Sequence, residues 1–205
     1  MKHSIIVEIT GKIMMKTFGL ILFFSLSQSE YLFRPNLPMG EYKLVYNKLY
    51  HCEPKKNNPI QLNWFISKKT SSITELKGNL TFMRPLDDTL ILDINFASWG
   101  STGGWIPNSN IIKSKKAFSS VKYLFGNGWI ILAKGFNMTS DSCPVPVGTY
   151  ITSGVDFKKL EDNNFPKVYF YGKYKISISF KNVENEVVGC TVAEVNLIRP
   201  WETPI

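Results

Sequence analysis

Along several segments of this chain, apolar residues alternate with polar ones at a period of two. The pattern is clearest in the ranges 89–96 and 173–180. The apolar positions that share one face in these ranges are Leu90, Leu92, Ile94 and Phe96, and Tyr174, Ile176, Ile178 and Phe180. Such alternation is typical of antiparallel strands with one buried and one solvated face. We expect the two apolar rows to face each other from opposite sheets and to enclose an apolar interior.

Other parts of the chain add short strands and one helix to this picture. Further strands fit the ranges 42–46, 61–66, 79–83 and 187–197. Polar turns separate the segments, and many short strands with polar turns predict an all-β antiparallel sandwich or barrel. The range 114–125 predicts one short helix.

Two apolar segments do not fit the alternating pattern. The range 126–132 is an apolar cluster bracketed by glycines, and it is either a core strand or an apolar flap at the mouth of a cavity. The range 165–171 carries bulky side chains without polar alternation and forms a second candidate lip. Loops this apolar often contact a ligand, a partner or a membrane. The lip side chains would be Trp129, Ile131, Phe165, Val168 and Phe170.

The N-terminal segment has the pattern of a secretory signal. Lys16 precedes an apolar run over 17–24, and small residues follow over 25–29. This order is typical of a signal peptide, and the run is shorter than the ~20 apolar residues that span a bilayer. The alternative is a buried N-terminal strand. We expect residues 1–29 to be a signal peptide, with Met14 or Met15 as an alternative start. A single domain would then cover 30–205, in a secreted, extracellular or lysosomal protein.

Composition fits a globular domain with a basic surface. Of 205 residues, 44% are hydrophobic and 20% are charged, which argues against disorder and against a coiled coil. The formal net charge is +8, and paired lysines are spread over several polar ranges. These lysines either form an ordinary solvated surface or attract anionic lipid headgroups. In the second case each lysine near a membrane would contribute about 1 kcal/mol of binding free energy. The sequence has no recognisable nucleic-acid-binding motif, so we do not expect nucleic acid as a partner.

Cysteines and sequons agree with secretion. Cys52, Cys143 and Cys190 allow three single pairings, each of which leaves one cysteine over. Asn79 and Asn137 each begin an Asn-x-Thr sequon, and we expect both to be glycosylated surface positions.

The chemistry of common enzymes is missing from the sequence. His51 is the one histidine after residue 29, and it lies beside Cys52. We find no glycine-flanked nucleophilic serine, no phosphate-binding glycine loop and no His/Cys cluster at metal-binding spacing. We therefore expect no enzymatic activity, no catalytic residue, no metal and no cofactor.

A series of short motifs runs from Cys52 to Leu197. The motifs are Gly78-Asn79-Leu80-Thr81, Cys143-Pro144, Gly148-Thr149-Tyr150, Phe165-Pro166, Gly172-Lys173-Tyr174 and Gly189-Cys190. Their order resembles the lysosomal activators of ganglioside GM2 breakdown, within the MD-2-related lipid-recognition group, which also includes secreted arthropod proteins. The resemblance implies an immunoglobulin-like β-sandwich or cup with an apolar cavity. It also implies a non-enzymatic activity, in which a lipid is extracted and presented to a partner such as a glycosidase or a receptor.

The cysteines depart from the pattern of this family, which has more of them. In the family the first cysteine pairs with the Gly-Cys of the last strand, which implies a Cys52–Cys190 disulfide here. The partner of Cys143 is missing. We expect Cys143 to be either buried and free or paired with another chain.

The expected mechanism is the binding of a lipid between two splayed sheets. Each methylene group moved from water into such a cavity gains about 0.8 kcal/mol. The residues we assign to the cavity wall, which would otherwise be ordinary core, are Leu92, Ile94, Leu124, Phe125, Trp129, Ile176 and Ile178. The lip residues would touch a membrane transiently. The alternatives are a carrier of a small apolar signal, such as a sterol, fatty acid or pheromone, and an extracellular protein-binding sandwich with a filled core.

Overall fold

The computed structural model describes residues 36–52, 58–70 and 73–203. The expected signal peptide over 1–29 lies outside the described residues. Residues Pro38–Ile205 form one compact unit, which contains the described strands and helices. Within the described residues, no helix has the length and apolar character needed to cross a membrane.

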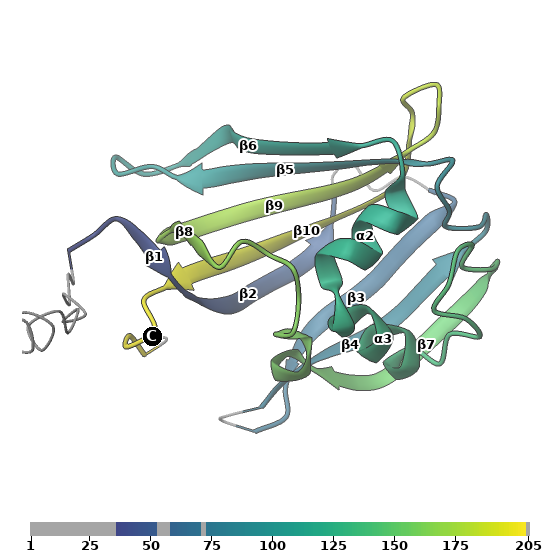
Figure 1. Ribbon diagram of the computed structural model, residues 1–205, viewed down its shortest axis with the longest axis horizontal. Helices are drawn as coiled ribbons and strands as arrows, with labels where there is room; N and C mark the ends of the chain where they lie inside the picture. Colours follow the sequence, from purple (N-terminus) through teal and green to yellow (C-terminus); the bar gives the residue numbers. More distant parts are fainter. Residues whose placement is uncertain (1–35, 53–57, 71–72, 204–205) are drawn as a thin grey trace, which may run out of the picture. The chain divides into compact units, whose positions relative to one another are not determined.

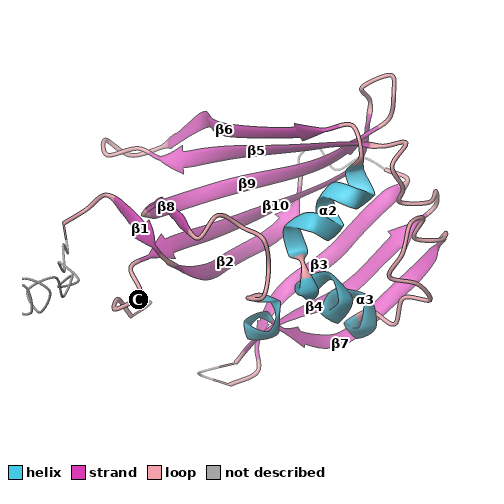
Figure 2. Ribbon diagram, viewed as in Figure 1, coloured by secondary structure: helices cyan, strands magenta, loops and turns pink. Residues whose placement is uncertain are grey.

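The predicted all-β sandwich is confirmed (Figures 1 and 2). In the described residues, ten strands form three antiparallel sheets, and there are two short α-helices where the sequence predicted one. The strands are β1 Met39–Glu41, β2 Lys43–His51, β3 Ile60–Lys68, β4 Thr74–Phe82, β5 Ile91–Trp99, β6 Trp105–Ser114, β7 Gly148–Asp156, β8 Val168–Phe170, β9 Gly172–Lys181 and β10 Val187–Ile198. The helices are α2 Ala117–Phe125 and α3 Asn127–Gly135, and η1 is a short 3₁₀ helix over Phe157–Leu160.

The largest sheet has five strands in the order β2-β10-β9-β5-β6. Its β5 and β9 strands carry the two alternating rows, and they pair directly, with Ile94 opposite Ile178 and Phe96 opposite Ile176. The rows therefore lie side by side on one face of one sheet, and the expectation that they face each other across the sandwich is wrong. Residues paired on neighbouring strands point to the same face, so the two rows form one continuous apolar wall.

The opposite sheet has three strands in the order β3-β4-β7, and the β1–β8 pair forms a separate ribbon. Figure 1 shows α2 and α3 beside the three-stranded sheet. One hydrophobic cluster includes buried side chains from both sheets and from both helices, among them Leu62, Leu80, Leu92, Phe118 and Leu132. The helices therefore help to fill one end of the space between the sheets.

The segment 126–132 is neither a strand nor a flap. It begins helix α3, and Gly126, with φ 53°, separates α2 from α3. In α3 and just after it, Trp129, Leu132, Ala133 and Phe136 are all buried, which is the spacing of one helical face. Glycines commonly break helices, and the flanking Gly126 and Gly128 obscured this period in the sequence.

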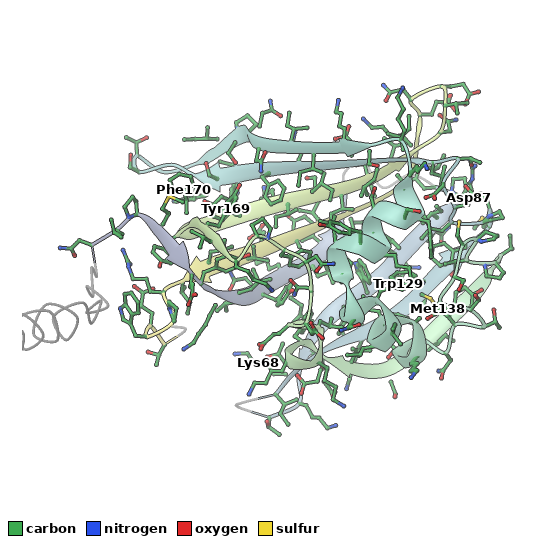
Figure 3. The ribbon with its side chains drawn as sticks, viewed as in Figure 1. Lys68, Asp87, Trp129, Met138, Tyr169 and Phe170 are labelled. Atoms are coloured by element: carbon green, nitrogen blue, oxygen red, sulfur yellow. A yellow bond between two sulfur atoms is a disulfide. The ribbon has the colours of Figure 1, made fainter. Side chains whose placement is uncertain are left out.

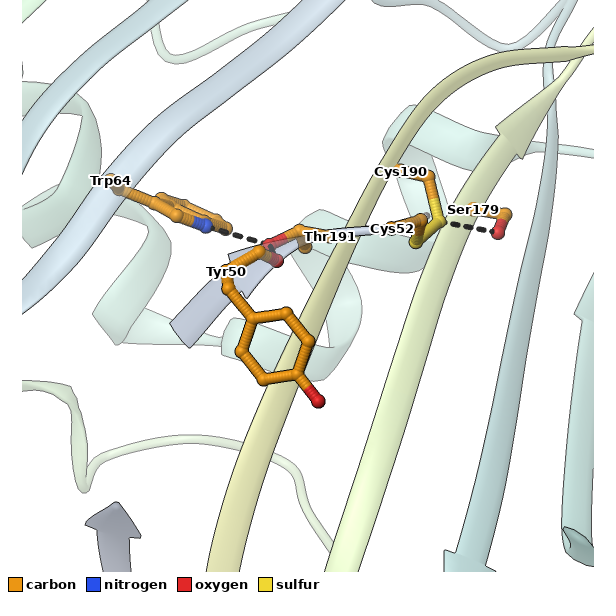
Figure 4. Close-up of a disulfide and its surroundings, with 6 residues drawn as sticks. All are labelled: Tyr50, Cys52, Trp64, Ser179, Cys190 and Thr191. Carbon is orange, nitrogen blue, oxygen red and sulfur yellow. Dashed lines mark hydrogen bonds between the residues drawn. A yellow bond between two sulfur atoms is a disulfide. The ribbon is translucent and has the colours of Figure 1, made fainter. Parts of the chain in front are cut away.

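A disulfide joins Cys52 to Cys190, as the resemblance implied, with 5.6 Å between the Cα atoms (Figure 4). It connects the end of β2 to β10, which pair as neighbours. Next to it, the Trp64 Nε1–H donates to Thr191 Oγ1 at 2.9 Å, which links the two sheets. Cys143 is exposed and unpaired in the described structure, so the buried alternative for this thiol is wrong.

Candidate ligand-binding site

An apolar cavity of about 210 Å³ lies between two hydrophobic clusters of the domain. The first cluster fills the helical end of the sandwich. The second is built on the other part of the five-stranded sheet, from Tyr174, Ala193, Val195 and Leu197. Members of both clusters line the cavity. The two clusters therefore leave a space between them that side chains of the described residues do not fill.

The five-stranded sheet provides one wall of this cavity, through inward positions of β5, β9 and β10. Trp64 and Leu76 contribute from the opposite sheet, and α2 contributes from the side. Ile176 and Ile178 point inward but are only half-buried, because they border this space. The cavity has no charged side chain in its described lining, so it suits an apolar ligand.

The structure brings most of the predicted wall residues together around this cavity. Those that line it are Leu92, Ile94, Leu124, Phe125, Ile176 and Ile178. Trp129 is outside the lining and only 5% exposed. Its ring packs edge-on against Phe118 at 5.5 Å between centroids, and its Nε1–H donates to the Asp141 carbonyl at 2.8 Å. Trp129 is therefore a core residue, and its assignment to both wall and lip is wrong.

Of the other predicted lip residues, one lies in the core and three lie at the cavity or on β8. Ile131 lies in α3 and packs against the core, so it is not at a lip. Phe165 lines the cavity and packs edge-on against Phe125 at 5.7 Å between ring centroids. Val168 and Phe170 are 47% and 52% exposed on β8. Figure 3 shows Phe170 beside Tyr169, away from Trp129.

Residues 165–171, which include strand β8, form a strap beside the cavity. Tyr169, between the two exposed residues, lines the cavity. Three hydroxyl groups tie the strap down: Tyr42 donates to the Pro166 carbonyl at 2.7 Å, Tyr174 to the Phe170 carbonyl at 3.0 Å, and Tyr171 to the Glu41 carbonyl at 3.0 Å. The β1–β8 pairing adds backbone contacts.

Two of the tyrosines that hold the strap, Tyr42 and Tyr174, have raised pKa values. Burial raises the pKa of Tyr42 and of Tyr174 above the ordinary value of 10.0, and the nearby Tyr169 adds to both shifts. Burial also raises the pKa of Tyr46, which lines the same cavity and stacks on Phe157 at 4.1 Å between centroids. The hydroxyl groups of Tyr42, Tyr46 and Tyr174 are therefore neutral at pH 7 and able to donate.

A second, more polar pocket of about 440 Å³ adjoins the apolar cavity. The residues that line both pockets are Tyr42, Leu44, Tyr46, Phe157, Leu160, Phe165 and Pro166. The charged residues of the polar pocket are Lys43, Lys158, Lys167, Asp156 and Glu161. The site thus combines an apolar chamber with a charged one.

The most buried carboxylates lie outside both pockets and are held by lysines. Lys69 Nζ is 3.0 Å from Glu75 Oε1, and this hydrogen bond lowers the pKa of Glu75. Asp93 Oδ2 lies 2.6 Å from Lys181 Nζ. His51 is half-buried on β2 and also lies outside both pockets. Within the described ranges, no group of three or more His, Cys, Asp or Glu side chains could hold a metal ion.

The two predicted glycosylation sites both adjoin Ile151 of the three-stranded sheet. Asn79 is half-exposed on β4 and is paired with Ile151 of β7. Asn137 is exposed, and its Nδ2–H donates to the Ile151 carbonyl at 3.1 Å. Glycosylation of both asparagines stays a prediction.

Several lining residues were missed by the sequence analysis. Tyr42 lies just before β2 and alternates with Leu44 and Tyr46 within it, in a range that was predicted as a strand. Ala193 and Val195 alternate in the same way on β10. The alternation marks these residues as inward-facing. It does not indicate that β2 and β10 belong to the same wall as β9, which depends on long-range pairing.

A scan against models of known families finds no match to this chain, and a search of curated proteins finds none either. The resemblance to the ganglioside activators therefore stays a prediction from the motifs.

Proposed function

We propose that this protein binds a lipid or another apolar small molecule in the cavity between its sheets and carries it without converting it chemically. The observation that supports this best is the apolar cavity itself, which adjoins half-buried inward residues such as Ile176 and Ile178. A filled core would place these side chains in contact with other protein atoms on every side. The motif order that resembles lipid-recognition proteins supports the same function.

The energetics favour an apolar occupant. A cavity of ~150 Å³ lined by apolar side chains stays dry and binds benzene or xenon, so a space of 210 Å³ with a similar lining would also accept hydrocarbon. Each methylene group buried from water adds about 0.8 kcal/mol. A catalytic function has no comparable support, because the carboxylates of Glu75 and Asp93 are engaged in ion pairs.

Binding of a neutral apolar dye such as Nile red tests this proposal. We expect one saturable site per chain. Ile178→Asn places an amide in the cavity and should weaken binding, whereas Ser177→Asn, one residue along β9 and outside the cavity lining, should not. Urea denaturation of both variants establishes that they are folded. Equal dye binding by the two variants would contradict the proposed site.

Uptake from a membrane is a further part of the proposal. The exposed Val168 and Phe170 flank Tyr169, which lines the cavity, so they could enter a bilayer surface beside the cavity. We expect Val168→Ser with Phe170→Ser to slow uptake of a fluorescent lipid from vesicles and to leave solution dye binding unchanged. Ile151→Ser with Val183→Ser is the matched control, because both residues are exposed elsewhere. Equal uptake by the two double variants would refute the membrane contact at β8.

A further inference from the structure

The polar pocket beside the cavity is lined by lysines that have no carboxylate partner among the described residues. Lys43, Lys158 and Lys167 line it, and none of them forms an ion pair with a carboxylate in the described structure. The Lys167 ammonium donates one hydrogen bond, to the Asn163 carbonyl at 2.9 Å, and each ammonium has three donors in all. The three lysines are therefore free to hold an anion.

The acidic residues of the same pocket do not cancel this charge. The three lysines outnumber Asp156 and Glu161, so the lining has a formal excess of one positive charge. This formal excess of positive charge in the lining favours an anionic group over a cationic one.

The apolar cavity limits the hydrocarbon part of a ligand. A cavity of ~150 Å³ holds one benzene molecule, so a cavity of 210 Å³ has room for a hydrocarbon group only somewhat larger than that. That is room for one short chain and not for the two chains of a membrane lipid. The polar pocket is adjacent to this cavity, because seven residues line both spaces, so a head group there would lie next to a chain in the cavity.

We infer that the ligand is a single-chain amphiphile with an anionic head, whose chain occupies the apolar cavity and whose carboxylate or phosphate lies among Lys43, Lys158 and Lys167. This inference rests on the proposed function. It adds the chemical class of the ligand and assigns these three lysines to its recognition.

Calorimetric titration of the full chain, with its disulfide intact, tests the inference with three probes of equal chain length: decanoate, decanol and decyltrimethylammonium. Because hydrogen bonds between ions are stronger than those between neutral groups, decanoate should bind roughly tenfold more tightly than decanol. Decyltrimethylammonium should bind most weakly. Comparing the probes on the unmodified protein requires no variant to fold.

Lysine variants then locate the head group. The triple variant K43Q/K158Q/K167Q should lose the preference for decanoate and keep its affinity for decanol. The control K48Q/K115Q/K134Q removes three exposed lysines outside both pockets and should keep the preference. Circular dichroism establishes that both variants fold.

The outcomes distinguish this inference from the proposed function. If decanol binds and decanoate has no advantage, or if K43Q/K158Q/K167Q keeps the advantage, the cavity stands and the anionic head is wrong. If didecanoyl phosphatidic acid binds as tightly as decanoate, the single-chain class is wrong. If none of the probes binds, the proposed function is wrong as well.

Discussion

Replacing Ala193 by phenylalanine should fill much of the cavity from inside and leave the fold stable. Ala193 lies on β10, lines the cavity, and is paired with Leu49 on one side and Ile176 on the other. A phenyl ring has nearly the volume of benzene, and a cavity of ~150 Å³ holds one benzene molecule. The new ring would therefore take up well over half of the 210 Å³.

The matched control is the same substitution in the packed core. Ala117 is 0% exposed at the start of α2 and does not line the cavity. Inserting a ring where side chains already fill the space typically costs about 1–3 kcal/mol. At position 193 the ring enters empty space and buries apolar surface, so the free energy of unfolding should change by less than about 1 kcal/mol.

Urea denaturation followed by tryptophan fluorescence measures both stabilities, and titration with Nile red measures binding. We expect Ala193→Phe to bind the dye at least about tenfold more weakly, because its site is occupied. Ala117→Phe should be destabilised and, while folded, should bind normally. If Ala193→Phe loses as much stability as Ala117→Phe, or binds the dye as the unmodified chain does, the space beside residue 193 is not a ligand cavity.

Three further predictions concern the framework around the site. Replacing Cys52 and Cys190 together by serine should lower the free energy of unfolding by about 5 kcal/mol in a chain-entropy treatment, because the bridge spans 138 residues; an unchanged urea midpoint would contradict this. Thr191→Val removes the buried acceptor of the Trp64 indole N–H and should cost about 1–3 kcal/mol, whereas Thr191→Ser should cost less. The hydrogen bond from Lys69 lowers the pKa of Glu75, so ionised Glu75 stabilises the fold above its ordinary pKa of 4.5, and this contribution is lost as the pH falls through the lower folded value. Denaturation at decreasing pH should therefore show a smaller loss of stability for Glu75→Gln than for the unmodified chain, and equal losses would refute the role of this carboxylate.

The strands were predictable where burial acts on one face. The ranges around β5, β9 and β10 alternate because one side of each strand meets the apolar interior and the other meets water. The partners of each strand were not predictable in the same way. The pairing of β5 with β9 joins segments about 80 residues apart, and nothing local in either segment distinguishes a neighbour in the sheet from a partner across the sandwich.

The site was predictable only in part, for the same reason. Inward residues such as Ile94 and Ile178 could be read from their alternation, and they line the cavity. Trp129 was misassigned because an apolar run between glycines does not reveal a helix that packs on the core. The polar pocket was missed because its lysines come from β2, from η1 and from the strap, and they meet only after the chain has folded.

Native mass spectrometry of the purified full chain, before and after extraction with organic solvent, tests the central claim most directly. We predict that each chain carries or takes up one small amphiphile, that decanoate occupies the same single site, and that Ala193→Phe takes up neither. A chain that carries no small molecule and takes up neither decanoate nor decanol would contradict the proposed function.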